Sequence, residues 1–255
     1  MNERARQEQS IERTIEGEKG FNKLLISPQG ARIEELFLEG QKIFTKVKRG
    51  DKKIGSSHPC IPQFMKETIT FFDLPQHGSA RDKDFKLETA TKTDLMLSQN
   101  IEDGKYPKGL RIDQRHSLAD GKYSLATIIY NGNDQDLPVN FAEHLYWQTP
   151  RGWGGLIING VDVTEVVKKD SAINLLSENE IIIPGLRPII LEQKGLPIAE
   201  LWSYKNPETG EYDKNYVCIE PAEGNPKNDF FGSEESMIKS HRHRTTEISI
   251  KLSEK

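Results

Sequence analysis

The segment LPQHGSARDKDF (74–85) gathers side chains that could bind a ligand. His77, Gly78 and Arg81 lie within five residues, directly after the strand-like run TITFF (68–72). A glycine beside a histidine allows a close approach of the backbone, and an arginine can form paired hydrogen bonds to a carboxylate, a phosphate or two hydroxyls. The alternative interpretation is a polar loop with Arg81 at the surface.

A second candidate is His144, in the segment VNFAEHLYWQTP, which is predicted to be a strand. An imidazole can act as a general acid near neutral pH. The neighbouring Tyr146 and Trp147 offer aromatic faces, which suit the apolar C–H surfaces of sugar rings. The alternative is a histidine at the edge of the core with its hydrogen bonds satisfied.

A third candidate is Glu220, which ends the apolar run YVCIE and precedes Pro221. A carboxylate that closes an apolar strand is partly desolvated, and desolvation raises its pKa and makes it a better base. The alternative is an ordinary solvated strand end.

Other clusters of polar residues are weaker candidates for a functional site. His241 and His243 would share one face of a strand, but no third metal ligand is evident near them, so we expect no metal site. The sequence contains no GxxxxGK[ST], GxGxxG or GxSxG motif. Nucleotide-dependent chemistry and serine-hydrolase chemistry therefore have no support.

Short apolar or β-branched runs must position these groups. The turn dipeptides Asp120-Gly121 and Asn131-Gly132 suit tight hairpins. No stretch after residue 20 keeps a helical period over three turns, and the segments 177–180 and around Ile101 are the weak helix candidates. The pattern predicts an all-β protein, an antiparallel sandwich or barrel. The predicted strand runs are LLIS (24–27), ELFL (35–38), TITFF (68–72), LRI (110–112), SLATIIY (124–130), VNFAEHLYW (139–147), LIING (156–160), IIIP (181–184), PIIL (188–191), YVCIE (216–220) and TEISIKL (246–252).

The composition limits the partners of the chain. Its 255 residues are 35% hydrophobic and 29% charged, with a net charge of −4 and the two signs mixed, so binding of nucleic acid through bulk charge is excluded. No apolar run approaches the ~20 residues that span a bilayer. We expect a polar arm over residues 1–20, no signal peptide, a cytoplasmic location and one domain over residues 21–255. Cys60 and Cys218 are expected to be buried thiols.

Four stretches in this order resemble the aldose 1-epimerase (galactose mutarotase-like) family, and most of all its hexose-6-phosphate mutarotase branch. The resemblance runs from about Leu24 to Leu252, and the His-Gly-x-Ala-Arg motif is its most specific part. The matching stretches are SPQGARIEEL (27–36), PCIPQF with LPQHGSAR (59–64 and 74–81), NFAEHLYW (140–147) and VCIEPAEG (217–224).

The resemblance implies a large antiparallel β-sandwich and a cofactor-independent mutarotase. Such an enzyme interconverts the α and β anomers of an aldohexose or of its 6-phosphate. His144 would be the general acid that protonates the ring oxygen, and Glu220 the general base that takes the proton of the anomeric hydroxyl. His77, Arg81 and Trp147 would bind the substrate, and neither a metal nor an organic cofactor would be needed. The main alternative is a non-catalytic carbohydrate-binding or regulatory protein on the same fold. A polysaccharide lyase or hydrolase is disfavoured because the chain is small.

The sequence differs from the hexose-6-phosphate mutarotase branch at one stretch that concerns substrate binding. The branch usually shows an Arg-Gly-Gly-Ile-Pro stretch, and this sequence has GSSHP (55–59), so an arginine of that branch is missing. Lys52 and Lys53 lie nearby and could compensate for it. His58 is unusual at its position and could face the pocket, the alternative being a packed or solvent-facing imidazole.

Overall fold

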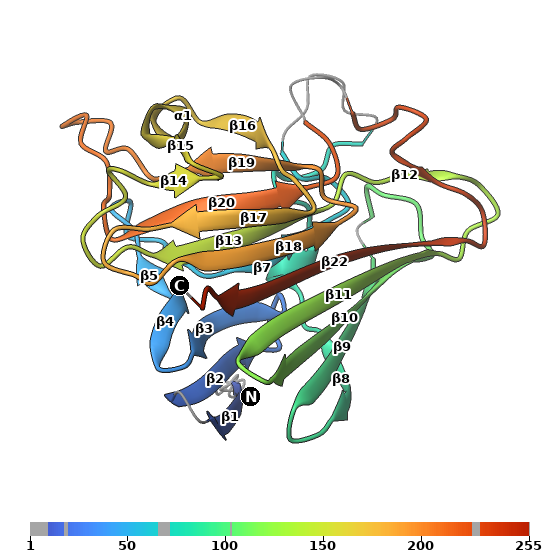
Figure 1. Cartoon of the computed structure of the whole chain (residues 1–255). Helices are drawn as coiled ribbons and strands as arrows, with labels where there is room; N and C mark the ends of the chain where they lie inside the picture. The colour runs from blue at the N-terminus through green and yellow to red at the C-terminus, as the bar shows by residue number, and fades with distance from the viewer. Residues whose placement is uncertain (1–9, 18–19, 66–71, 103, 226–229, 255) are drawn as a thin grey trace, which may run out of the picture.

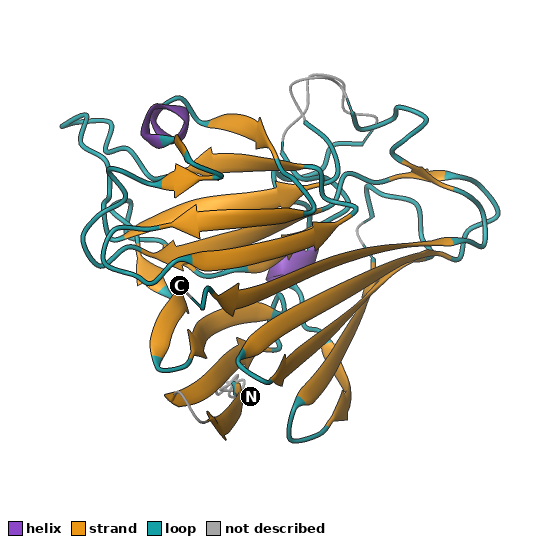
Figure 2. Ribbon diagram, viewed as in Figure 1, coloured by secondary structure: helices purple, strands orange, loops and turns teal. Residues whose placement is uncertain are grey.

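The computed structural model describes residues 10–17, 20–65, 72–102, 104–225 and 230–254. Strands and loops make up nearly all of this part of the chain (Figure 2). The strands form two large antiparallel sheets, each of nine strands within the described residues (Figure 1). The predicted all-β antiparallel fold is therefore confirmed.

The first sheet has the strand order β1-β2-β3-β4-β13-β20-β19-β16, and β7 also pairs with β13. Its strands are β1 (Ile11–Gly17), β2 (Gly20–Ser27), β3 (Arg32–Leu38), β4 (Gln41–Thr45), β7 (His58–Cys60), β13 (Ala142–Gln148), β16 (Ser171–Asn174), β19 (Ile198–Trp202) and β20 (Tyr216–Ala222).

The second sheet has the order β15-β14-β17-β18-β22-β11-β10-β9-β8. Its strands are β8 (Lys86–Ala90), β9 (Asp94–Ile101), β10 (Leu110–Ala119), β11 (Lys122–Asn131), β14 (Ile157–Ile158), β15 (Val161–Asp162), β17 (Glu178–Ile182), β18 (Ile189–Lys194) and β22 (His243–Leu252). Two small ribbons and two short helices complete the described elements. They are β5 (Val47–Lys48) with β6 (Ile54–Gly55), β12 (Leu137–Pro138) with β21 (Met237–Ile238), α1 (Thr164–Lys168) and the 3₁₀ turn Ala80–Asp82.

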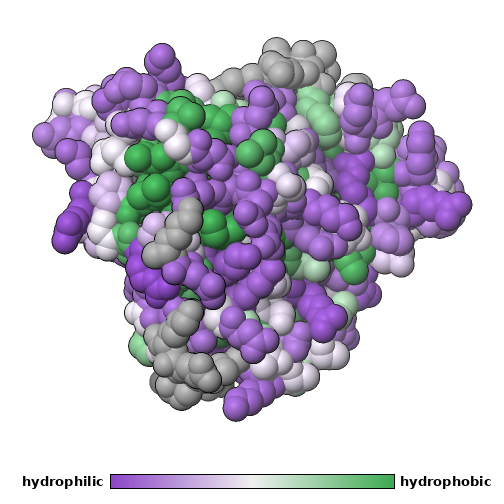
Figure 3. Space-filling view, in the orientation of Figure 1, coloured by the Kyte–Doolittle hydropathy of each residue, from purple (hydrophilic) through white to green (hydrophobic). Residues whose placement is uncertain are grey.

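The core lies where the two sheets pack face to face. Phe44 of β4 meets Tyr123 of β11 edge-on, with 6.4 Å between the ring centroids. In β10 and β11, buried and more exposed residues alternate, as expected for strands with one face on a core. In β13 and β20 nearly every residue is buried, because their second face is covered as well. Figure 3 shows polar residues over most of the visible surface.

The predicted hairpin at Asp120-Gly121 joins β10 to β11, and both residues have positive φ, 52° and 69°. Asn131-Gly132 does not close a hairpin. Asn131 ends β11, and its side-chain amide donates to the carbonyls of Gln135 and Ile238, which directs the chain away from the sheet.

Other expectations differ from the structure. Residues 11–17 of the expected arm form the edge strand β1, paired along its length with β2, while residues 1–9 and 18–19 lie outside the described residues, as do residues 68–71 of the predicted strand TITFF. The weak helix candidates belong largely to β17 and β9. In the described part of the chain, no helix is long and apolar enough to cross a membrane.

Candidate active site

A cavity of about 480 Å³ opens on the face of the first sheet that points away from the core. Its walls carry charged, imidazole and aromatic side chains from segments far apart in the sequence. The cations are Arg32, Arg49, Lys53 and Arg81, the imidazoles His58, His77 and His144, the carboxylates Asp82, Asp170, Glu200 and Glu220, and the aromatic rings Tyr146 and Trp202.

The period of two residues along β13 sorts its side chains between cavity and core. His144 and Tyr146 share the cavity face, and their rings stack at 4.9 Å. Trp147 points the other way, is fully buried against Phe44 and donates from its indole nitrogen to the carbonyl of Ile219. The structure thus corrects the placement of Trp147 at the substrate, and the tryptophan that lines the cavity is Trp202 of β19.

Strand β20 lies beside β13 and brings Glu220 to His144. The Nε2 atom of His144 is 3.3 Å from Oε1 of Glu220, and the two side chains are only 5% and 4% exposed. Two residues from distant parts of the sequence therefore meet as a buried acid–base pair.

Burial governs the protonation of this pair. It raises the pKa of the Glu220 carboxyl well above its usual range, and the negative charges of Glu200 and Asp170 raise it further. Glu200 is the residue directly opposite Glu220 in the pairing of β19 with β20. Burial lowers the pKa of the His144 imidazole, with further lowering by His58 and His77. Both effects disfavour the charged forms, so the pair holds one proton over a wide pH range.

The loop that carries the HGSAR motif contributes His77 and Arg81 to the lining of the cavity. The Nδ1 of His77 is 2.8 Å from the carbonyl oxygen of Phe64, and its ring meets His144 edge-on at 5.0 Å. Burial, followed by the positive charge of Arg81, lowers the pKa of His77 to about 3. His77 is therefore a neutral imidazole at physiological pH.

Gly78 allows two backbone segments to pack closely beside the cavity. Its φ is +66°, and a Cβ atom there would lie 1.8 Å from the carbonyl oxygen of Ile61. The close approach allowed by this glycine is thus an approach between two protein backbones, and it fixes the position of the neighbouring His77.

Arg81 lies in the 3₁₀ turn and lines the cavity, with its Nε 3.6 Å from a carboxylate oxygen of Asp82. The backbone carbonyl of Arg81 accepts a hydrogen bond of 2.9 Å from Arg32. Arg32 and Arg81 therefore lie close together in the wall of the cavity.

The sequence of the chain matches the family model of aldose 1-epimerases over residues 30–217. The chain belongs to the aldose 1-epimerase family. No curated protein sequence matches it.

Solved structures have the same fold as this epimerase-family chain. The Slr1438 protein of Synechocystis sp. PCC 6803 superposes with a TM-score of 0.76 at 17% identity, over 97% of each chain. A galactose mutarotase related enzyme from Lactobacillus acidophilus gives 0.73 at 15% identity, over 95% of this chain and 97% of its own. A galactose mutarotase-like protein from Lactobacillus casei ATCC 334 gives 0.72 at 16% identity, over 96% of this chain and 100% of its own.

The structure adds Arg49 to the residues that the sequence indicated in this epimerase-family site. Its guanidinium lies 4.7 Å from the ring centroid of Trp202 and donates to Asp51 at 2.9 Å. Lys53 also lines the cavity, whereas Lys52 does not. The turn between β5 and β6 is so rich in cations that its sequence alone could not show which of them faces the cavity.

One group of described residues in the epimerase-family site could hold a metal ion. The ligand atoms of His144, Cys218 and Glu220 all lie within 4.8 Å of one another. Histidine, cysteine and carboxylate ligands together suit Zn²⁺. A metal bound there would occupy the same atoms that a proton transfer would use.

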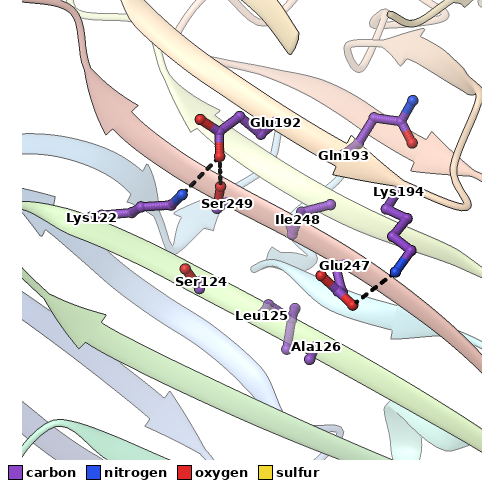
Figure 4. A pocket seen from close by; sticks show the side chains of 10 residues that line it. All are labelled: Lys122, Ser124, Leu125, Ala126, Glu192, Gln193, Lys194, Glu247, Ile248 and Ser249. Atoms are coloured by element: carbon purple, nitrogen blue, oxygen red, sulfur yellow. Dashed lines mark hydrogen bonds and ion pairs between the residues drawn. The ribbon is translucent and has the colours of Figure 1, made fainter. Parts of the chain in front are cut away.

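A second groove, of about 320 Å³, lies on the second sheet (Figure 4). Its Glu192 accepts hydrogen bonds from Lys122, Lys251 and Ser249, which lower its pKa to about 2. Glu192 already has three hydrogen-bond donors, and no imidazole lines the groove. The groove therefore lacks the acid–base pair of the first cavity.

Proposed function

We propose that the chain interconverts the α and β anomers of an aldohexose or of a hexose 6-phosphate by general acid–base catalysis. The observation that carries the proposal is the contact between His144 and Glu220 within the cavity. Membership of the aldose 1-epimerase family supports the same reaction class. The cavity volume of about 480 Å³ falls in the range of small-molecule sites.

The contact suits the positions of the two reacting oxygens. In a cyclic aldose the ring oxygen and the anomeric hydroxyl are both bonded to C1, so a neighbouring acid and base can reach both. The proton of the pair first moves from Glu220 to His144 across their 3.3 Å contact. Glu220 then takes the proton of the anomeric hydroxyl while His144 gives its proton to the ring oxygen, which leaves the pair uncharged. The bond between C1 and the ring oxygen breaks, and an open-chain aldehyde forms.

Rotation about the bond between C1 and C2 then presents the other face of the aldehyde. Closure reverses both proton transfers and gives the other anomer. The pair carries one proton before and after the cycle, so no proton is gained or lost. Burial favours the uncharged pair that exists while the ring is open, because it raises the pKa of Glu220 and lowers that of His144.

His77, Arg81 and Arg49 would hold the sugar. The two arginines, with Lys53 and Arg32, line the cavity, where each lies within 4.0 Å of a carboxylate oxygen of Asp51 or Asp82. Guanidinium groups can form paired hydrogen bonds to a phosphate, which supports a 6-phosphate as part of the substrate. Arg49 and Lys53 would replace the arginine missing from the stretch 55–59.

The test is anomer exchange measured by NMR with glucose 6-phosphate, galactose 6-phosphate, glucose and galactose. Acceleration for any of them supports the mutarotase, and acceleration limited to the phosphates assigns the cations to phosphate binding. Sugar binding without acceleration would refute the enzyme and favour a carbohydrate-binding protein.

A further inference from the structure

His58 lies directly beside the acid–base pair. It is the residue opposite His144 in the pairing of β7 with β13, so the two side chains share one face of the sheet. Their rings stack with 4.8 Å between centroids and an interplanar angle of 26°. The side chain lines the cavity although His58 is only 4% exposed.

The hydrogen bonds of His58 fix its tautomer. Its Nδ1 is 2.8 Å from the backbone carbonyl oxygen of Ser56. A carbonyl oxygen only accepts, so Nδ1 carries the hydrogen and Nε2 of the neutral ring is a bare acceptor. Burial, together with the positive charge of Arg32, lowers the pKa of His58 and keeps the ring neutral.

That acceptor has no partner within the protein. Nε2 of His58 is buried and has no hydrogen-bond partner among the residues that the structure describes. Buried polar atoms are nearly always hydrogen-bonded in folded proteins. Because His58 lines the cavity, this orphaned nitrogen points to a partner that arrives with the ligand.

We propose that His58 accepts a hydrogen bond from a hydroxyl group of the bound sugar and so contributes to substrate specificity. This inference rests on the proposed function for the identity of the ligand. The hydroxyl is one close to the reacting carbon, because the His58 ring stacks on His144.

The tautomer decides the chemical class of the recognised group. A carboxylate or a dianionic phosphate offers only acceptors, so neither can satisfy Nε2 of a neutral His58. A hydroxyl can donate to it. His77 has the same arrangement, because its Nδ1 donates to the carbonyl of Phe64. Two neutral imidazoles therefore offer acceptors for hydroxyl groups. A phosphate would be bound by the arginines and Lys53 instead.

The test compares two variants of His58 that differ in the acceptor. In His58→Asn the amide nitrogen takes the place of Nδ1 and keeps the bond to Ser56, but the acceptor at Nε2 is lost. In His58→Gln the amide oxygen comes near the place of Nε2 and can still accept. Binding of the parent sugar and of its monodeoxyfluoro analogues is measured by calorimetry, since a fluorine in place of a hydroxyl cannot donate.

We expect one analogue to bind the wild-type protein about tenfold more weakly than the parent sugar, as for the loss of one hydrogen bond. The same analogue should lose little in His58→Asn and should lose affinity again in His58→Gln. Equal losses in the wild type and in His58→Asn for every analogue would overturn the proposal, as would a wild type that is indifferent to every fluorine. A wild type that binds sugar without interconverting anomers refutes the proposed function alone, because affinity still tests His58.

Discussion

The Nε2 atom of His144 lies 3.3 Å from Oε1 of Glu220, and neither side chain is more than 5% exposed. Adjacent strands bring the two together, although they are far apart in the sequence. An acid and a base in contact, shielded from water, can act together on the two oxygens of one anomeric carbon.

Replacement of the carboxylate should remove the base and leave the shape of the site. We expect Glu220→Gln to lower kcat by about 10²–10⁴-fold, with a much smaller change in sugar affinity. The measurement is anomer exchange together with sugar binding. A variant that loses affinity and rate in equal proportion would show that Glu220 binds and does not transfer a proton.

The pH dependence of kcat/KM should be bell-shaped. The pair gains a second proton only at a pH well below 6.5, because burial lowers the pKa of His144. It loses its last proton well above pH 4.5, because burial and Glu200 raise the pKa of Glu220. Glu200→Gln should therefore move the alkaline limb of kcat/KM to lower pH. An unmoved alkaline limb would contradict this assignment.

Arg49 should matter for a phosphorylated sugar and little for a free one. Arg49→Met keeps apolar contact with the ring of Trp202 but removes the charge, and we expect KM for the hexose 6-phosphate to rise about tenfold, which corresponds to ~1.4 kcal/mol. Lys52→Met is the matched control, since Lys52 is exposed and does not line the cavity. Equal effects of Arg49→Met on both kinds of sugar would refute a phosphate role.

Gly78 should be intolerant of a side chain. Gly78→Ala places a Cβ against the carbonyl of Ile61 at a φ of +66°, and the left-handed backbone alone costs about 1–2 kcal/mol. Urea unfolding measures the loss. Gly154→Ala is the control, because a Cβ at Gly154 meets nothing within 4 Å. Equal stability of the two variants would contradict the packing described for this loop.

Glu143 should make stability depend on pH. It lies between the sheets, hydrogen-bonded to Gln114 at 2.7 Å and Thr127 at 3.2 Å, and burial raises its pKa from 4.5 to about 8. The unfolded chain releases this proton at lower pH than the folded one, so the free energy of unfolding falls as pH rises from 4.5 towards 8. Glu143→Gln should flatten that fall in urea unfolding series. If the free energy of unfolding of Glu143→Gln falls with pH as steeply as that of the wild type, Glu143 is not the group responsible.

Much of the fold could be predicted from the sequence, because apolar runs and turn dipeptides are local signals. Asp120-Gly121 fits two positive φ angles, and the structure has its hairpin there. The charged segment 11–17 gives no apolar strand signal, because an edge strand such as β1 tolerates charged residues. Helix α1 has five residues, too few for a helical period to show.

The site was harder to predict, because its geometry depends on pairing between distant strands. The alternation along β13 places Trp147 and His144 on different faces of the strand, but it does not show which face lines the cavity. The orphaned acceptor of His58 depends on the carbonyl of Ser56 and on the register of β7 with β13. The resemblance supplied His144 and Glu220, and the strand order explains why they meet.

The most direct test of the account is anomer exchange by NMR in the wild type, Glu220→Gln and Glu192→Gln, with the same sugar. Glu192 is a control carboxylate in the groove of Figure 4, which lies on the second sheet, whereas His144 and Glu220 belong to the first. We expect fast exchange in the wild type and in Glu192→Gln, and loss of exchange with retained sugar binding in Glu220→Gln. Fast exchange in Glu220→Gln would contradict the role of Glu220 as the base.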